Sequence, residues 1–290
     1  MLKYMVDKYT KALESGWMRL TEESRYLSFS GVRIHFSVVR PDTPIHSRML
    51  LVASPLTSAF HWRKLLPELS GLGCLAVLAD LPGFGRSSCP GPQSADTRAN
   101  LMWGVLDEVD RGLGTPMSLW HLAACGSACA TILRMAVQYP DSVKSQIHIA
   151  PLFSVASPVK HPSDEAGWFR ANVEDGRRFK QMIERCAAFP LDDYIVDRMR
   201  APLLRPGGEA NFQRMLKQSA LPPKAGADFC PAMALIGGRD PLMDDVRLRQ
   251  VHALLKDAEI HRLASAGHFP METHSKALRD YLRGWIRYNE

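Results

Sequence analysis

The chain has 290 residues, of which 46% are hydrophobic and 23% are charged, so it carries enough apolar material for one large folded domain. This composition excludes a disordered chain, and the apolar runs are too short for a membrane helix. The N-terminal segment alternates apolar and charged residues, unlike a secretory signal. We therefore expect a cytoplasmic protein whose six cysteines are reduced thiols rather than disulfides.

The formal net charge of +6 comes from scattered basic residues rather than from one cluster. A mildly basic surface attracts acidic metabolites, acyl carriers or nucleic acid in a general way, but no nucleic-acid-binding motif accompanies it. We expect a small-molecule substrate, either free or bound to a carrier. We expect neither a nucleic acid nor a membrane as a partner.

Residues 2–20 predict an amphipathic helix, because Met5, Tyr9, Leu13 and Trp17 recur every four residues. We expect this helix to pack on the body of the domain. A dimer contact and a lid over a pocket are the alternatives.

Alternating apolar residues over 26–40, with Gly31 at the turn, predict a β-hairpin. Six short apolar runs follow, and helical patterns separate most of them. The runs are 49–53, 75–79, 118–123, 146–150, 232–236 and 260–263. Strands that alternate with helices form a mostly parallel sheet with helices on both faces, so we expect an α/β fold.

Residues 151–226 interrupt this alternation with helical patterns over 167–187 and 190–199 and no strong strand. An insertion after a strand of an open α/β sheet lies near the carboxyl ends of the strands, where such sheets bind ligands. We therefore expect a helical cap at 151–226 and a core made of residues 21–150 and 227–290. A homodimer formed through the N-terminal helix or through the cap stays open.

Several loops of the predicted sheet carry motifs. Residues 50–69 contain a strand, a loop that reads Ser-Pro-Leu-Thr-Ser and a helix, and residues 79–88 read Ala-Asp-Leu-Pro-Gly-Phe-Gly-Arg-Ser-Ser. Residues 121–143 place a turn of small residues between a strand and a helix, and 234–245 pairs with 263–286. In this order the segments resemble the α/β-hydrolase superfamily, in its haloalkane dehalogenase and esterase-like branch. The resemblance implies the α/β-hydrolase fold.

The resemblance also implies that Asp240 and His268 are the acid and the histidine of a catalytic triad. An acid in this position accepts a hydrogen bond from one imidazole nitrogen and leaves the other nitrogen to act as a base. Asp244 and Asp245 are alternatives for the acid. The structural alternatives are a turn-capping role for Asp240 and a surface position for His268.

The superfamily carries its nucleophile at the centre of a Gly-x-Ser-x-Gly turn. Counting inward from residues 121–122 and 139–140 places Gly126 at that centre, where there is no nucleophilic side chain. Ser127 is an alternative nucleophile if the turn is shifted by one residue. Cys125 is another, because a thiolate beside a helix N-terminus has a lowered pKa. Small, buried packing is the structural alternative for the cysteine.

The same alignment affects the oxyanion hole. Residues 53–54 align with the superfamily's His-Gly pair, so Pro55 stands where a backbone N–H would otherwise donate. Losing one such donor costs an enzyme roughly 100- to 1000-fold in rate. The N–H of Ser127 can remain as the second donor.

Four side chains on the loop that faces this site are candidates for binding a substrate oxygen. They are Ser54, Thr57, Ser58 and His61. Ordinary turn and helix-cap hydrogen bonding is an equally good interpretation of these residue types.

Three functions fit these residues. We favour an enzyme with a His-Asp pair and no serine nucleophile, of the lyase, isomerase, cyclase or cofactor-free oxygenase type, acting by general acid–base chemistry on a small metabolite. The alternatives are an esterase, thioesterase or lactonase that uses Ser127 or Cys125, and a non-catalytic ligand-binding protein. The cysteine spacing is not that of a zinc site and no glycine-rich dinucleotide motif follows the first parallel strand, so we expect neither a metal nor a cofactor.

Overall fold

The computed structural model describes residues 24–29, 31–89, 91, 93–115, 118–153, 165–217 and 230–290. The helix predicted over residues 2–20 lies outside these ranges and stays a prediction. Within them, no helix is both long enough and apolar enough to cross a membrane.

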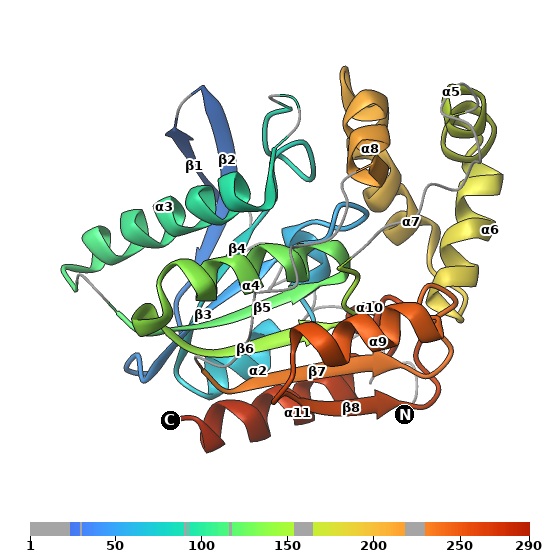
Figure 1. Ribbon diagram of the computed structural model, residues 1–290. Helices are drawn as coiled ribbons and strands as arrows, with labels where there is room; N and C mark the ends of the chain where they lie inside the picture. The colour runs from blue at the N-terminus through green and yellow to red at the C-terminus, as the bar shows by residue number, and fades with distance from the viewer. Residues whose placement is uncertain are drawn as a thin grey trace, which may run out of the picture.

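An eight-stranded sheet forms the centre of the molecule, in the order β1-β2-β4-β3-β5-β6-β7-β8 (Figure 1). The pairs β1–β2 and β2–β4 are antiparallel, and the remaining neighbours pair parallel. The strands are β1 Ser24–Phe29, β2 Val32–Val39, β3 Ser47–Val52, β4 Cys74–Ala79, β5 Trp120–Cys125, β6 Val143–Ile149, β7 Ala232–Gly237 and β8 Glu259–Leu263. The mostly parallel sheet predicted from the sequence is confirmed.

The predicted strands correspond to real ones because the parallel strands are covered on both faces. Every residue of β4, β5 and β7 is buried, which requires a continuous apolar run. The predicted hairpin is also present, and Gly31 at its turn has a φ of +78° that favours glycine. The strand predicted at 118–123 begins two residues later, because the Ser118 hydroxyl donates to the carbonyl of Thr115 at 3.0 Å and closes a turn before the strand. The strand then extends to Cys125.

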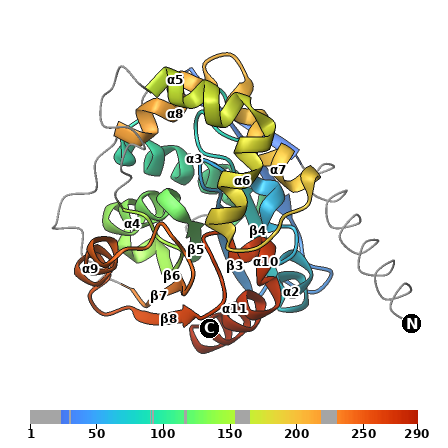
Figure 2. The same ribbon diagram turned by 90° about the vertical axis from the view of Figure 1, so that its right-hand side faces the viewer.

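Helices cover both faces of the sheet. Figures 1 and 2 show α3, α4 and α9 on one face, and α2 and α11 on the other. The helices are α2 Leu66–Gly71, α3 Ala95–Leu113, α4 Cys129–Gln138, α9 Asp245–Leu254, α10 Pro270–Thr273 and α11 Ser275–Tyr288. In α11 the buried side chains recur every three or four residues, as expected for a helix with one face on the core.

Further helices are inserted between β6 and β7. They are α5 Glu165–Phe169, the π-helical turn η5 Arg170–Glu174, α6 Gly176–Ala187, α7 Asp193–Arg200, the 3-10 turn η6 Ala201–Leu204 and α8 Gly208–Lys217. Figure 1 shows that α5 to α8 gather beyond the carboxyl ends of the parallel strands. The helical pattern predicted over 167–187 is broken at Asp175, whose carboxylate caps the start of α6. The division of the chain into core and cap stays a prediction, because residues 154–164 and 218–229 lie outside the described ranges.

A buried ion pair joins two distant parts of the core. Two guanidinium nitrogens of Arg63, which follows the turn η1 Ala59–Trp62, donate to the two carboxylate oxygens of Glu272 in α10, at 2.5 and 2.9 Å. The ammonium of Lys64 lies 3.0 Å from the same carboxylate. Burial raises the pKa of Glu272, but the hydrogen bond from Arg63 and nearby positive charges outweigh this effect. They hold the pKa of Glu272 below its usual value. The pair therefore fixes the segment after β3 against the segment after β8.

We predict that Glu272→Gln lowers the free energy of unfolding by about 3 kcal/mol, because it leaves the buried guanidinium of Arg63 without its counter-charge. Since the pKa of Glu272 is lowered in the folded state, this stabilisation is present above the pKa of the unfolded chain and is lost as the pH falls. Urea unfolding at pH 7 measures the loss. Glu68→Gln is the matched control, since Glu68 also binds an arginine with both oxygens, but in a pair that is only partly buried. Equal losses in the two variants would contradict this account.

Candidate active site

His268 and Asp240 meet at the carboxyl ends of β8 and β7. The imidazole Nδ1 of His268 lies 2.7 Å from Oδ2 of Asp240, and the two side chains are 3% and 0% exposed. The other carboxylate oxygen of Asp240 accepts the backbone N–H of Leu242 at 2.9 Å. With both oxygens bonded, Asp240 holds the imidazole in one orientation, with Nε2 on the side away from the acid.

The alternative acids predicted from the sequence lie elsewhere. Asp244 caps the start of α9 by accepting the backbone N–H of Arg247 at 2.8 Å, and its side chain is half exposed. Asp245 is an exposed residue in the first turn of the same helix. Of the three acids, only Asp240 contacts the imidazole of His268 through a hydrogen bond in the described ranges.

The backbone of His268 is held by an inserted helix. Its N–H donates to the carbonyl of Cys186, in the last turn of α6, at 2.8 Å. A side chain on Gly267 would collide with the backbone of Ala187, so glycine is required where these two segments touch. This contact could not be predicted from the sequence, because no spacing pattern links residues 186–187 with residues 267–268. The inserted helices thus help to place the histidine.

Gly126 lies at the turn between β5 and α4, opposite the imidazole. Its φ is +55°, and a Cβ built on it would lie 3.2 Å from Nε2 of His268 and 2.8 Å from Oγ of Ser54. The backbone carbonyl of Gly126 accepts the N–H of Leu152 at 3.1 Å, which fixes the turn against the segment after β6. A side chain at position 126 would therefore point directly at the histidine and at Ser54.

Cys125 and Ser127 flank this glycine but are placed differently. Cys125 is 1% exposed, and burial raises the pKa of its thiol to about 11. The expectation that Cys125 has a lowered pKa is therefore wrong, because burial outweighs any effect of the helix that follows. Ser127 is half buried in the 3-10 turn η2 Gly126–Ala128, and in the described ranges no hydrogen bond joins its hydroxyl to His268.

The loop after β3 divides into two parts. Thr57 donates to the carbonyl of Ser54 from its backbone N–H at 2.8 Å and from its hydroxyl at 3.1 Å, and so closes a turn. The backbone N–H of Ser58 donates to Nδ1 of His61 at 2.9 Å, at the start of η1. Burial is the main cause that lowers the pKa of His61 to about 4. These hydrogen bonds are those of a turn and a helix cap, whereas the Ser54 hydroxyl faces Gly126, and Pro55 follows it without an N–H.

In the ranges that the structure describes, no group of three or more His, Cys, Asp or Glu side chains is arranged to hold a metal ion. The residues that meet here, namely His268 with Asp240, Gly126 and Ser54, provide an oriented base, a space without a side chain and a hydroxyl.

Comparison with solved structures shows the same architecture in several enzymes. The meta-cleavage product hydrolase of Pseudomonas fluorescens superposes with a TM-score of 0.74 at 15% identity, covering 93% of this chain and 100% of that one. The enol-lactonase of Burkholderia xenovorans gives 0.73 at 16% identity, covering 91% and 100%. The haloalkane dehalogenase of Agrobacterium tumefaciens gives 0.70 at 18% identity, covering 92% and 97%. At these identities the likeness shows the fold alone.

A search of curated proteins finds no match to this sequence. The match to a protein family is extensive, however, and covers residues 49–281, from β3 into the last helix. This range contains His268, Asp240, Gly126 and Ser54. The chain therefore belongs to the Alpha/beta hydrolase family.

Proposed function

We propose that this chain is an enzyme that uses His268, oriented by Asp240, as a general base on a small molecule, without a covalent intermediate. The observation that carries this proposal is the glycine at position 126, whose absent side chain would point at Nε2 of His268. An oriented imidazole opposite a space without a nucleophile is suited to moving a proton of a bound substrate.

The proposed reaction begins with a substrate that carries an acidic C–H or O–H, such as an enolisable or phenolic metabolite, lying over Gly126. Nε2 of His268 takes this proton, and the electron pair stays on the substrate as an enolate or phenolate. The imidazolium is stabilised by the carboxylate of Asp240 at 2.7 Å. It then returns the proton to another position or to a leaving group. Isomerase, lyase and cyclase chemistry need only this sequence, and a cofactor-free oxygenase would add O₂ to the same anion.

Ser54 is suited to hold the oxygen on which the negative charge develops. Its hydroxyl lies on the same side of Gly126 as the imidazole, since both are within 3.2 Å of the place where a Cβ would stand. It can donate to an enolate oxygen where Pro55 has no N–H to offer. The backbone N–H of Ser127 is the second donor in this proposal. The burial of the whole group strengthens these interactions, because little water competes for the charges.

Two features support this reaction over ester hydrolysis by a serine or cysteine. Covalent catalysis needs a nucleophile within hydrogen-bond reach of the base, and neither Ser127 nor Cys125 makes such a bond in the described ranges. The proline at position 55 removes a donor that acyl transfer normally uses. A protein that only binds ligands would not need the oriented His268–Asp240 pair.

We predict that the protein catalyses exchange of substrate C–H for deuterium in D₂O, and that His268→Ala slows this exchange at least 100-fold. NMR with a panel of 1,3-dicarbonyl and phenolic compounds measures the rate. Asp240→Asn should also slow exchange, because the amide favours the wrong imidazole orientation and tautomer. The control is His261→Ala, in which an imidazole outside the site is removed. Unchanged exchange in His268→Ala would refute the proposal, and a folded protein that binds panel compounds without exchanging any would favour the ligand-binding alternative.

We predict that a fluorophosphonate probe leaves no adduct on the native protein but labels the Gly126→Ser, Ser54→Ala double variant. The new serine would lie beside Nε2 of His268, and removal of the Ser54 hydroxyl relieves the 2.8 Å approach. Intact-protein mass spectrometry detects the adduct. Adding His268→Ala to the double variant should abolish labelling, which separates an activated serine from a merely accessible one. An adduct on Ser127 in the native protein would instead establish the esterase, thioesterase or lactonase alternative.

We predict that iodoacetamide at pH 8 does not modify Cys125 in the folded protein. The raised pKa leaves the group as a thiol, and its 1% exposure blocks the reagent. Peptide mapping before and after unfolding in urea reports the modification, and Cys89, which is partly exposed, is the reactive control. Rapid modification of Cys125 in the folded state would show that it is an activated nucleophile.

A further inference from the structure

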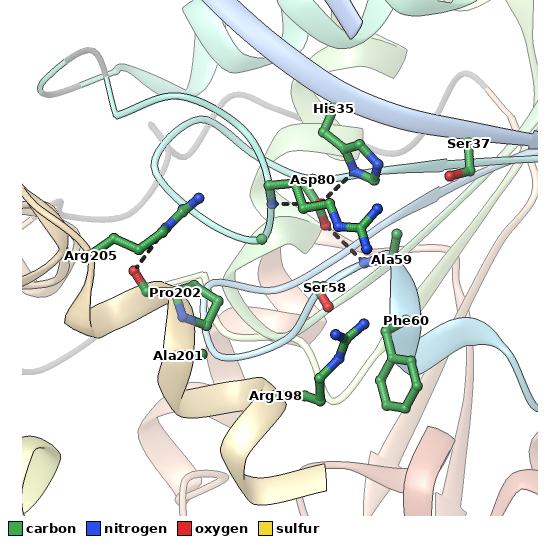
Figure 3. Close-up of a pocket in the computed structure, with 12 residues that line it drawn as sticks. His35, Ser37, Ser58, Ala59, Phe60, Asp80, Arg198, Ala201, Pro202 and Arg205 are labelled. Atoms are coloured by element: carbon green, nitrogen blue, oxygen red, sulfur yellow. Dashed lines mark hydrogen bonds and ion pairs between the residues drawn. The ribbon is translucent and has the colours of Figure 1, made fainter. Parts of the chain in front are cut away.

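A cavity of about 290 Å³ lies between the core and the inserted helices (Figure 3). Its core wall comes from β2, the start of η1 and the loop after β4, and its other wall comes from α7 and η6. His268, Asp240 and Gly126 do not line it. The cavity is therefore distinct from the acid–base pair, although Ser58 in its wall belongs to the loop that carries Ser54.

The described lining of this cavity carries more positive than negative charge. Three arginines line it, and they are Arg86, Arg198 and Arg205. The only carboxylate in the described lining is Asp80, which is 1% exposed. Its Oδ2 lies 2.8 Å from Nδ1 of His35 and accepts the backbone N–H of Arg86 at 2.9 Å, and its Oδ1 accepts the backbone N–H of Ala59 at 2.8 Å. Asp80 is thus engaged mainly by backbone and imidazole groups.

The central arginine is held in place by an aromatic ring. The guanidinium carbon of Arg198 lies 4.7 Å from the centre of the Phe60 ring, and Figure 3 shows this guanidinium between Ser58 and Phe60, directed towards Asp80. Arg63 contacts the same ring at 3.9 Å. Guanidinium groups stack on aromatic rings, and they recognise planar anionic groups through their N–H edges.

The positive groups here also repel one another. Burial is the main cause that lowers the pKa of Arg198, Tyr194 and Asp80 oppose it, and the charges of Arg86 and Arg63 lower the pKa further. An anion that enters the cavity, between the cations of the core and the cation of the inserted helices, would relieve this repulsion.

We propose that this cavity binds the carboxylate or phosphate group of a small molecule, with Arg198 and Arg205 from the inserted side and Arg86 from the core as its ligands. Arginine forms paired, charge-assisted hydrogen bonds with both kinds of group, which makes it the residue of choice for such recognition. The apolar part of the lining, formed by Phe60, Ala201 and Pro202, would contact the carbon skeleton next to the anion. The site stands apart from the proposed acid–base chemistry, because it uses none of the same side chains.

Isothermal titration calorimetry with succinate and with inorganic phosphate, in a low-salt buffer, tests this site. We expect saturable binding of at least one anion, weakened at least 10-fold in Arg198→Gln and in Arg205→Gln, because each loses a charge-assisted hydrogen bond. The matched control is Arg177→Gln, which removes the same charge from an exposed position on α6 outside the cavity. Its affinity should stay within twofold of the native value, and circular dichroism verifies that each variant is folded.

Absence of saturable binding of both anions would overturn the proposal, and so would an equal loss in Arg177→Gln, which would mean a general effect of net charge. Comparison of succinate with phosphate identifies which group the cavity prefers. Competition between the bound anion and an anionic compound that undergoes exchange would identify the substrate as the source of the group. Undisturbed anion binding in the presence of that compound would identify a separate effector. Because His268→Ala leaves the cavity intact, anion binding by that variant can succeed or fail independently of the acid–base proposal.

Discussion

The carboxylate of Asp80 holds together the segments that meet at the carboxyl edge of the sheet. It accepts hydrogen bonds from the backbone of η1 and from the loop after β4, and its Oδ2 lies 2.8 Å from the imidazole of His35 on β2. A side chain on Gly85 would collide with this carboxylate, so the loop can wrap around it only because residue 85 is glycine. Since η1 begins at Ala59, this network also fixes the end of the short loop on which Ser54 faces Gly126. Both the candidate active site and the arginine-lined cavity depend on this one buried acid.

In the function that we propose, the His268–Asp240 pair acts as a base although residue 126, which faces the imidazole, is a glycine. A buried imidazole with one nitrogen held by a carboxylate has a defined basic face, whatever stands opposite it. In a serine hydrolase that face activates a hydroxyl of the protein itself. In the proposed reaction, Gly126 offers no such hydroxyl, and the same face accepts a proton from the substrate instead. Under this proposal, a change from covalent to proton-transfer chemistry needs no rearrangement of the histidine or of the acid.

Much of the fold could be predicted because its signals are local. Parallel strands buried on both faces produce continuous apolar runs, and the hairpin is marked by alternation and by Gly31. Gly126 could be placed by counting along a strand and a helix, both of which have regular lengths. The position of Ser54 opposite Gly126 could be suspected only from the motif of its loop. The two residues meet because β3 and β5, the strands that precede them, are neighbours in the sheet although they are distant in the sequence.

Other properties of the site depend on tertiary packing and leave no trace in sequence spacing. The pKa of Cys125 is set by the burial of the whole turn, which opposes the effect expected from the adjacent helix. The loop after β3 forms a turn whose conformation is not evident from the sequence, and this turn sets the roles of Thr57, Ser58 and His61. In the arginine-lined cavity, Arg86 is more than 100 positions from Arg198 and Arg205 in the chain, and only the folding of α7 and η6 against the core brings the three together.

The hydrogen bond from the backbone N–H of His268 to the carbonyl of Cys186 means that the last turn of α6 helps to fix the position of the proposed base. The inserted helices, which carry residues proposed to bind an anion, and the proposed base are therefore joined by a direct backbone contact. Recombining the insertion of one family member with the core of another would transplant a binding surface and would also move the imidazole. A change in these helices would therefore also shift the proposed proton acceptor, so that a new specificity and a new reactivity would arise together.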